Sequence, residues 1–380
     1  MRDLVSKRVA VVYMLAHPGG VQSCALALIR GLNRQGILPD ILWDTPPDTS
    51  LLAEAGAQAG FRRIPFRVPQ TSIVRLPDTL RYLAWIPNVI CGDQLAGRYD
   101  CIFSFYNGFL VPQKIPHVYY LSGPPLLPQL RIAPKGIRGA PLRCFQRLYR
   151  GMLRRRWPAY EYHRGCHYVI NSQYTAGLFH EAHGVRLPVV YPPVDTSNHS
   201  FDPADLPKRD TILFFSRIIG YKRPEMVLEL AARHRQYRCV VMGGVTPNRR
   251  SYFQTLQQRA RKARLEVVFL PNPTATTVRQ EMARARFYIF PAVNEHFGMT
   301  TPEAIASGAI PFVHDSGGQR EIVVNERLRF QDPEFFARFD ALVRAPAEHL
   351  GTIRQTLSKH VRTFSEEIFV SKMLASTGPI

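Results

Sequence analysis

The segment Phe290–Gly318, FPAVNEHFGMTTPEAIASGAIPFVHDSGG, constrains the fold of this chain more than any other. An apolar run, Phe287–Pro291, predicts a buried strand that leads into the segment, and a second apolar run, Ile310–Val313, predicts another strand after it. Between the two runs, Thr301 as N-cap and Pro302 as first helical residue predict a helix. The order strand, loop, helix, strand is the repeating unit of a parallel sheet covered by helices, so the segment predicts an α/β fold.

Two carboxylates lie in this segment, eight residues apart. Glu295 falls in the loop after the first predicted strand, and Glu303 falls in the opening turn of the predicted helix. In parallel sheets ligands bind at the carboxyl ends of the strands, so these acids, with the nearby backbone N–H groups, could hold a sugar and an anion together. The N–H groups in question belong to Phe297, Gly298, Met299 and Thr300. The plainer alternative is that Glu303 complements the helix dipole and that Glu295 is a solvated loop residue.

The spacing E-x7-E, followed by a glycine, a proline and a Gly-Gly pair, resembles the nucleotide-sugar site of retaining glycosyltransferases of family 4 with the GT-B fold. NEHFGMTTPEAIASGAIPFVHDSGG is especially similar to mannosyltransferases that extend lipid-linked oligosaccharides and to bacterial relatives that build surface polysaccharides. The resemblance implies two Rossmann-like domains, each a doubly wound parallel sheet, that face a cleft. It also implies metal-independent hexosyl transfer from a nucleoside-diphosphate sugar, GDP-mannose or a UDP-sugar, to a hydroxyl acceptor with retention of configuration.

A glycine pair, Gly19 and Gly20, separates the first predicted strand, Val9–Leu15, from a helical pattern that ends at Gly36. Glycines at this place let the backbone approach a phosphate at the helix N-terminus, although a lone Gly-Gly is more often a simple turn. The family resemblance implies that this loop contacts the donor diphosphate and faces the acceptor. The segment lacks G-x-G-x-x-G and therefore does not support NAD binding.

Two cations follow another predicted strand, Thr211–Phe215. Arg217 and Lys222 lie between this strand and the next helix, where a diphosphate would be neutralised. Two basic residues in a loop are usually only solvated, but SRIIGYKRPE resembles the family element R-x4-K, whose cations hold the donor diphosphate. Gly243 closes the following strand, Arg238–Met242, as in the family.

One expected residue of the family pattern is missing. Family members often carry His-x-Pro in a loop of the first domain, and here Ser122 stands two residues before the proline. His117 lies five residues earlier, at the other end of the predicted strand His117–Leu121, so a packing role for it competes with a catalytic one.

The resemblance assigns roles to the remaining residues. Glu303 would accept hydrogen bonds from two ribose hydroxyls, and Glu295 would hold sugar hydroxyls and orient the anomeric carbon. The cations Arg217 and Lys222 would stabilise the departing nucleoside diphosphate. Two alternatives stay open: a sugar-nucleotide epimerase with the same fold, and a non-catalytic basic protein that binds membrane or nucleic acid.

The chain of 380 residues is long enough for two domains of ordinary size. The polar, proline-bearing stretch 195–209 is the best interdomain linker. We therefore predict an acceptor-binding domain over 1–194 and a nucleotide-sugar domain over 195–362, with a terminal helix, 363–380, that packs back on the first domain as the resemblance implies.

The balance of 49 Lys and Arg against 29 Asp and Glu gives a net charge of +20 and predicts an anionic partner. Basic and apolar residues interleave over 131–164, which is typical of a helix at a membrane surface or of an ordinary surface helix. No nucleic-acid-binding motif appears, so nucleic acid is not expected. No metal-ligand spacing, apolar membrane span or signal peptide is present, and the six cysteines are scattered. These features predict a cytoplasmic protein that needs no cofactor, with peripheral attachment to the inner face of the membrane as an option.

Overall fold

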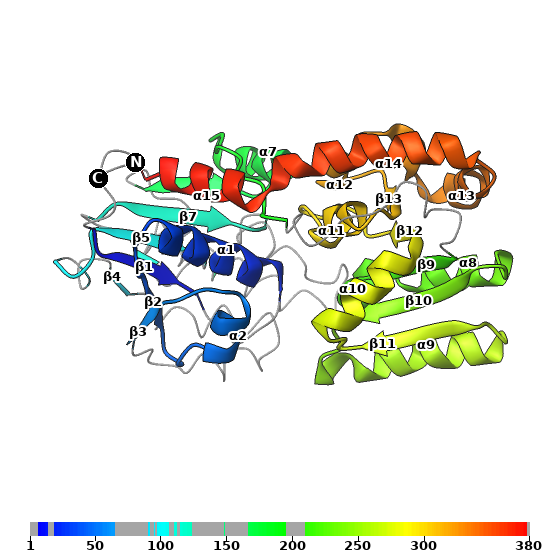
Figure 1. Ribbon diagram of the computed structural model, residues 1–380, viewed down its shortest axis with the longest axis horizontal. Coiled ribbons are helices and arrows are strands. Elements are labelled where there is room, and N and C mark those ends of the chain that lie inside the picture. The colour runs from blue at the N-terminus through cyan, green and yellow to red at the C-terminus, as the bar shows by residue number, and fades with distance from the viewer. Residues whose placement is uncertain are drawn as a thin grey trace. The chain divides into compact units, whose positions relative to one another are not determined.

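The computed structural model describes residues 7–13, 19–64, 90–91, 95, 97–105, 110–111, 115–123, 148, 166–194 and 210–377. The chain forms two units: unit 1, Met1–Pro193 together with Glu366–Ile380, and unit 2, Val194–Ser365. Each unit is built on a six-stranded parallel sheet flanked by helices (Figure 1).

The sheet of unit 1 has the strand order β3-β2-β1-β5-β7-β8, and a separate parallel pair joins β4 and β6. The described strands of this unit are β1 (Val9–Val12), β2 (Asp40–Trp43), β3 (Gly60–Arg63), β4 (Ile90–Cys91), β5 (Cys101–Ser104), β6 (Leu110–Val111), β7 (His117–Leu121) and β8 (His167–Ile170). The described helices are α1 (Gly20–Arg34), α2 (Thr49–Glu54), α7 (Gln173–His183) and α15 (Glu366–Ala375).

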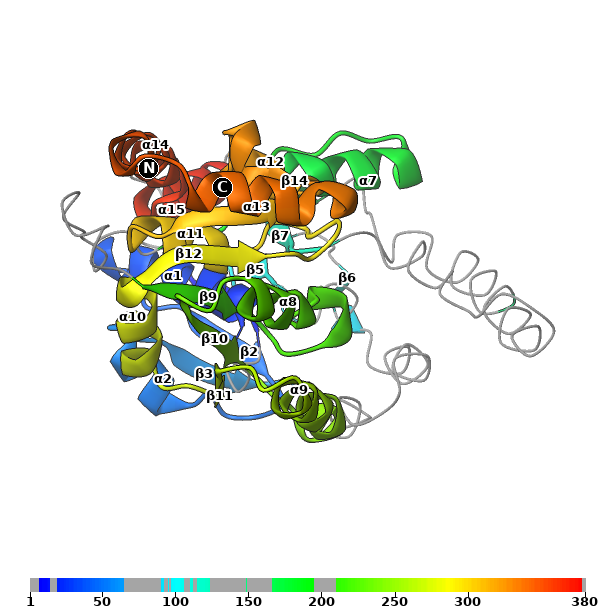
Figure 2. The same cartoon turned by 90° about the vertical axis from the view of Figure 1, so that its right-hand side faces the viewer.

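The sheet of unit 2 has the strand order β11-β10-β9-β12-β13-β14. Its strands are β9 (Thr211–Phe215), β10 (Arg238–Gly243), β11 (Val267–Pro271), β12 (Ala285–Phe290), β13 (Ile310–His314) and β14 (Arg329–Phe330). Its helices are α8 (Glu225–Arg233), α9 (Arg250–Lys262), α10 (Ala275–Arg284), α11 (Thr300–Ala306), α12 (Gln319–Ile322), α13 (Phe335–Val343) and α14 (Ala347–Val361). Helices α8 and α9 lie on one side of the sheet and α10 lies on the other (Figure 2).

The centre of sheet 2 is apolar because its strands are covered on both faces. Along β12 and β13 almost every side chain is buried, which matches the continuous apolar runs that parallel strands carry. From β9 the chain steps outward through β10 and β11, and from β12 it steps the opposite way through β13 and β14. The loops that leave β9 and β12 therefore meet at the switch point of the sheet, where open α/β sheets bind ligands. Both sheets are doubly wound, which confirms the predicted α/β class.

The last helix, α15, packs on the first helix, α1, within unit 1. The carboxylate of Glu366 accepts hydrogen bonds from the guanidinium groups of Arg30 and Arg34, the latter at 2.9 Å. At Gly31 the two helices approach so closely that a Cβ atom would lie 2.3 Å from a methyl group of Val370. The end of the chain is thus an integral part of unit 1.

The predicted start of one helix is wrong. Helix α11 begins at Thr300, and Thr301 does not cap it, so Pro302 is its third residue rather than its first.

Candidate functional site

The centre of the candidate site is an ion pair at the switch point of sheet 2. Lys222 lies on the 3₁₀ turn Gly220–Lys222 that follows β9, and Glu295 lies in the loop that follows β12. The Lys222 ammonium donates to the Glu295 carboxylate, although the two residues are 73 positions apart. Lys222 is only 4% exposed, so this charge is held almost out of water. A paired, desolvated cation at the carboxyl ends of the strands is well placed to meet an anionic ligand.

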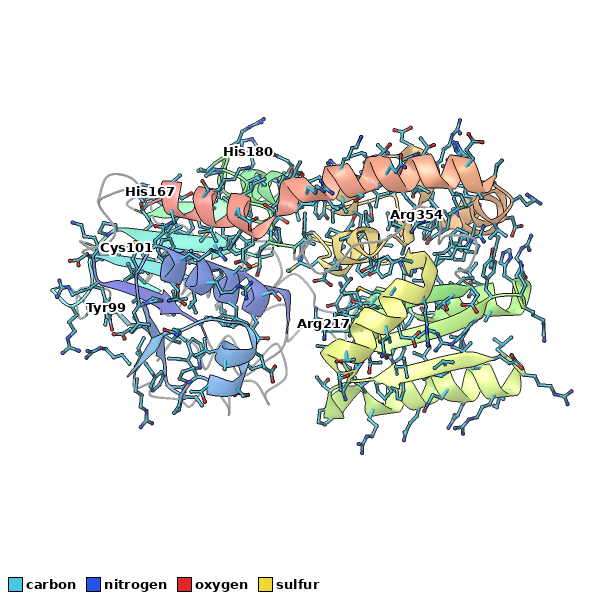
Figure 3. The ribbon with its side chains drawn as sticks, viewed as in Figure 1. Tyr99, Cys101, His167, His180, Arg217 and Arg354 are labelled. Carbon is cyan, nitrogen blue, oxygen red and sulfur yellow. The ribbon has the colours of Figure 1, made fainter. Side chains whose placement is uncertain are left out.

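Aromatic rings surround the two cations. The Lys222 ammonium lies 5.2 Å from the ring centroid of Tyr221 and 5.1 Å from that of Phe290. The Arg217 guanidinium donates to the Tyr221 hydroxyl at 2.6 Å and lies 5.9 Å from the centre of the same ring. Arg217 is exposed and lies at the carboxyl-end edge of sheet 2, where Figure 3 labels it. Tyr221 therefore links both cations and limits the directions in which they can point.

The charges of the site act on one another. Burial lowers the pKa of Lys222, while the adjacent Glu295 carboxylate opposes this shift and the Arg217 charge adds to it. Burial also lowers the pKa of His296; Glu295 opposes the shift, and Lys222 and Arg217 reinforce it. The charges of Arg217, Lys222 and Glu295 therefore all act on the His296 imidazole, and an anion bound beside Lys222 would feel both cations.

Glu303 lies next to this group, in the first turn of α11. Its neighbour is Tyr288 of β12, whose pKa is raised by burial and raised further by the charges of Glu303 and Glu295. The Tyr288 hydroxyl donates to the carbonyl of Phe215 at 3.0 Å, so the Thr300 hydroxyl, at 2.6 Å, must donate to the Tyr288 oxygen. Tyr288 thereby joins the end of β9 to the start of α11.

The loop that carries Glu295 is braced by the glycine pair after β13. The N–H of Gly318 donates to the carbonyl of Glu295 at 2.8 Å. Gly317 has φ +64°, and a Cβ atom there would lie 2.3 Å from the same carbonyl oxygen. A Cβ atom at Gly318 would lie 2.3 Å from the carbonyl oxygen of His296. Because only glycine fits at these two positions, the backbone of the acidic loop rests directly on the backbone of the next one.

Gly243 braces the loop after β9, which carries Arg217 and Lys222, in the same way. It ends β10 with φ +150°, and a Cβ atom there would lie 1.6 Å from the carbonyl oxygen of Ser216. The N–H of Ser216 bonds to Met242 at 3.2 Å, and that of Ile218 bonds to Gly244 at 2.9 Å. The chain on either side of Arg217 is therefore fixed by the close approach of β10.

Two of the predicted site residues, Gly19 and Gly20, belong to unit 1. Gly19 is the N-cap of α1, and no side chain caps the first turn of this helix among the residues described. The first turn carries no acidic residue either, which keeps this N-terminus suited to an anion.

His117 begins β7, at the amino edge of the sheet of unit 1, whereas the loops of a parallel sheet that bind ligands lie at the carboxyl edge. It is 1% exposed and stacks on Tyr119, with ring centroids 4.2 Å apart. This position favours a packing role over the catalytic one.

The buried His117 should make unit 1 sensitive to acid. Burial lowers its pKa to about 3, whereas the unfolded chain would have a value near 6.5. Between these values the unfolded state binds a proton that the folded state does not, so stability falls as the pH falls. We expect His117→Phe, which keeps the stacking, to remove about 2 kcal/mol of the stability lost between about pH 7 and about pH 5. Urea unfolding of both proteins at the two pH values measures this; equal losses in both would contradict it.

Several residues of the site were not predicted from the sequence. Tyr288 lies within an apolar strand, and no pattern distinguishes its hydroxyl from an ordinary buried tyrosine. Tyr221 lies between the two predicted cations, and Phe290 begins the key segment, so both could have been found as aromatic neighbours of Lys222.

Other predictions fall outside what the structure describes. The basic segment 131–164 has only Leu148 among the described residues, and the linker 195–209 and residues 378–380 are not described at all. Among the residues that are described, no group of His, Cys, Asp and Glu could hold a metal ion, and no helix is long and apolar enough to cross a bilayer.

Two family models match the chain. The model for Glycosyltransferase Family 4 matches residues 18–198, and the model for Glycosyl transferases group 1 matches residues 195–333. The predicted resemblance is thereby confirmed in both halves of the chain.

Curated relatives point the same way. A D-inositol 3-phosphate glycosyltransferase of Mycolicibacterium paratuberculosis is 28% identical over 214 residues, which cover 52% of this chain and 48% of the relative. A GDP-Man:Man(3)GlcNAc(2)-PP-Dol alpha-1,2-mannosyltransferase of Xenopus tropicalis is 26% identical over 216 residues, covering 51% of this chain and 44% of the relative. The chain thus spans about half the length of the curated relatives it matches.

Among solved structures, Alr3699/HepE of Anabaena in complex with UDP and glucose has a TM-score of 0.70 at 15% identity. The match covers 98% of this chain and 100% of that protein. The predicted fold, with its two doubly wound sheets, is thereby confirmed.

Proposed function

We propose that this chain, which belongs to the family 4 glycosyltransferases with the GT-B fold, transfers a hexose. The hexose passes from a nucleoside-diphosphate sugar to a hydroxyl group of an acceptor. The observation that carries the proposal is the contact between Lys222 and Glu295 at the switch point of sheet 2. It joins one residue that suits a diphosphate to one that suits sugar hydroxyls.

The two cations would hold the diphosphate. An ammonium group has three N–H donors, so Lys222 can keep its bond to Glu295 and still donate to phosphate oxygens. Arg217 is exposed and adds a planar guanidinium that suits two phosphate oxygens at once. At the end of β10, the backbone of Gly243 would line the nucleotide site, and Gly19 and Gly20 of unit 1 would contact the diphosphate from the acceptor side.

The two acids would hold the sugars. Glu303 would accept hydrogen bonds from two ribose hydroxyls, and Glu295 would orient the transferred hexose through its hydroxyls. The loop between them brings further backbone N–H groups to the same place. These groups belong to Phe297, Gly298, Met299 and Thr300.

In the transfer step the bond between the anomeric carbon and the phosphate oxygen breaks, and a bond from that carbon to the acceptor oxygen forms. The electron pair leaves with the nucleoside diphosphate, whose growing negative charge Arg217 and Lys222 stabilise. The acceptor proton passes to the departing phosphate oxygen. Attack from the face that the diphosphate leaves would retain the anomeric configuration, as expected for family 4.

The donor is proposed to carry GDP or UDP. The relative from Xenopus tropicalis is named as a mannosyltransferase that uses GDP-Man, which supports GDP-mannose. The Anabaena structure holds UDP and glucose, which supports a UDP-sugar. No cofactor or metal is proposed beyond this donor.

The acceptor is proposed to be lipid-linked or a polysaccharide. The same mannosyltransferase is named for an oligosaccharide on dolichyl diphosphate, and the basic segment 131–164 would place this protein at the inner face of an anionic membrane.

A panel of nucleotide sugars tests the function. We expect GDP-mannose or a UDP-sugar, and the matching nucleoside diphosphate, to raise the melting temperature, because a ligand that binds only the folded state stabilises it. A ligand at about 100 times its Kd adds roughly 2.7 kcal/mol of stability. ADP-glucose and nucleoside monophosphates serve as controls.

Two results would contradict the proposal. Absence of a shift with every nucleoside diphosphate would favour a non-catalytic basic protein. Conversion of the nucleotide sugar to its epimer without any acceptor would favour an epimerase, whereas a transferase would at most hydrolyse it slowly.

A further inference from the structure

One buried amide links the two ends of the loop that carries the proposed donor contacts. Gln319 is the first residue of α12, directly after the glycine pair, and it is fully buried. Its Nε2 donates to the carbonyl of Phe297 at 2.7 Å, and its Oε1 accepts from the Thr301 hydroxyl at 2.8 Å. The carbonyl can only accept and the hydroxyl donates here, so both bonds require this orientation of the amide.

The loop is shaped to receive this amide. Gly298 has φ +90°, and a Cβ atom there would lie 1.9 Å from Nε2 of Gln319. The amide therefore occupies the space that any other residue at position 298 would fill. The N–H of Thr301 also donates to the carbonyl of Gly298 at 3.0 Å, which closes a tight turn inside the span that Gln319 joins.

The residues between the two anchor points are the ones proposed to approach the donor. Gly298, Met299 and Thr300 lie between Phe297 and Thr301, so a single side chain fixes both ends of their backbone. Packing alone does not explain a glutamine at this place, since burying an amide is unfavourable unless its hydrogen bonds are made.

We propose that Gln319 is a positioning residue, which holds the backbone of residues 297–301 in the conformation that transfer requires. The inference rests on the proposed function for its kinetic consequence. It acts without touching substrate, because its two polar atoms are both engaged by the loop and its side chain is buried.

The test compares two variants of similar size. Gln319→Met removes both polar atoms, and we expect it to lower kcat/KM by roughly 10- to 100-fold, as misplacement of a reacting group by about 1 Å does. Gln319→Glu keeps the acceptor for Thr301 and turns the donor into a carboxylate oxygen that repels the Phe297 carbonyl. Once protonated, this carboxyl donates again, and burial raises its pKa toward neutrality.

The pH profile separates positioning from mere packing. Relative to wild type, the kcat/KM of Gln319→Glu should recover at least threefold as the pH falls from about 8 to about 6, whereas the ratio for Gln319→Met should stay constant. Thr301→Ser, which keeps the hydroxyl, should stay near wild type, and Thr301→Val should lose part of the activity. Gln258→Met on the exposed face of α9 is the matched control and should change nothing.

Hydrogen exchange provides a readout that does not depend on activity. In Gln319→Met the peptide that covers residues 295–301 should exchange faster, while the peptide that covers β9 should not. Unchanged exchange in this loop, a kcat/KM within threefold of wild type for Gln319→Met, or a flat ratio for Gln319→Glu would each overturn the inference. If the wild-type protein transferred no sugar, the proposed function would fail, and the exchange experiment would still decide the positioning role.

Discussion

Replacement of Lys222 by methionine is expected to lower kcat/KM by roughly 10²–10³-fold, the loss seen when one preorganised donor to a developing anion is removed. Lys222 is a nearly buried cation at the switch point of sheet 2, held by Glu295 and by the rings of Tyr221 and Phe290. Its ammonium is proposed to hold the leaving group, and methionine keeps most of the length of the side chain without the charge. Steady-state kinetics with the donor identified by the nucleotide panel measures the loss.

The same change should also weaken the fold. Loss of the ammonium leaves the Glu295 carboxylate, whose side chain is only 16% exposed, without its ion-pair partner. Truncating one member of an ion pair whose charges are both deeply buried typically lowers the free energy of unfolding by about 3–5 kcal/mol. We expect a smaller loss for this pair. The double variant Lys222→Met/Glu295→Gln should regain much of this stability but none of the activity.

This contrast between stability and activity isolates the chemical role. Lys262→Met, on the exposed face of α9, is the matched control and should leave both kcat/KM and unfolding unchanged. If the double variant turned over near the wild-type rate, the assignment of Lys222 to the diphosphate would be wrong.

Replacement of Gly243 by alanine is expected to cause the largest loss of stability. The new Cβ would overlap the carbonyl oxygen of Ser216, 1.6 Å away, and the residue would also have to keep φ +150°. Strained backbone and overpacking each cost roughly 1–3 kcal/mol, so we expect a loss of about 2–5 kcal/mol in chemical unfolding. If the Ser216 backbone moved to relieve this clash, it would displace Arg217, so kcat/KM should fall as well.

The adjacent residue provides the matched control. A Cβ atom at Gly244 would meet no other atom within 4 Å, and its φ lies outside the positive range that disfavours alanine. Gly244→Ala should therefore change stability by less than about 1 kcal/mol. Equal stability of the two alanine variants would show that β10 can shift away from Ser216 without cost.

The parts of the fold that repeat a local pattern were predictable from the sequence. Strands β9 and β12 consist mainly of apolar residues, and the runs Thr211–Phe215 and Phe287–Pro291 predicted both of them. Elements that depend on tertiary pairing were missed. Strand β3 has mostly exposed side chains, and β14 is two residues long and is defined by its pairing with β13.

The start of α11 shows why details of the site could not be predicted. Thr301 has the chemistry of an N-cap, but its hydroxyl is used by Gln319, eighteen residues later. The preceding Thr300 bonds to Tyr288, twelve residues earlier, and the helix begins at Thr300, two residues before the predicted first residue, Pro302. E-x7-E identifies the acids by their spacing, whereas the groups that hold the loop between them come from other strands and helices.

The position of α15 has a consequence for the way the protein is made. This helix, Glu366–Ala375, completes unit 1 by docking on α1, yet the ribosome adds it only after all of unit 2. Unit 2 can therefore fold during synthesis while α1 still exposes the surface around Gly31 that α15 will cover. A premature stop codon shortly after position 365 should leave unit 2 able to fold. Unit 1, at the other end of the chain, should fold poorly because α1 stays uncovered, and chaperones should then bind it.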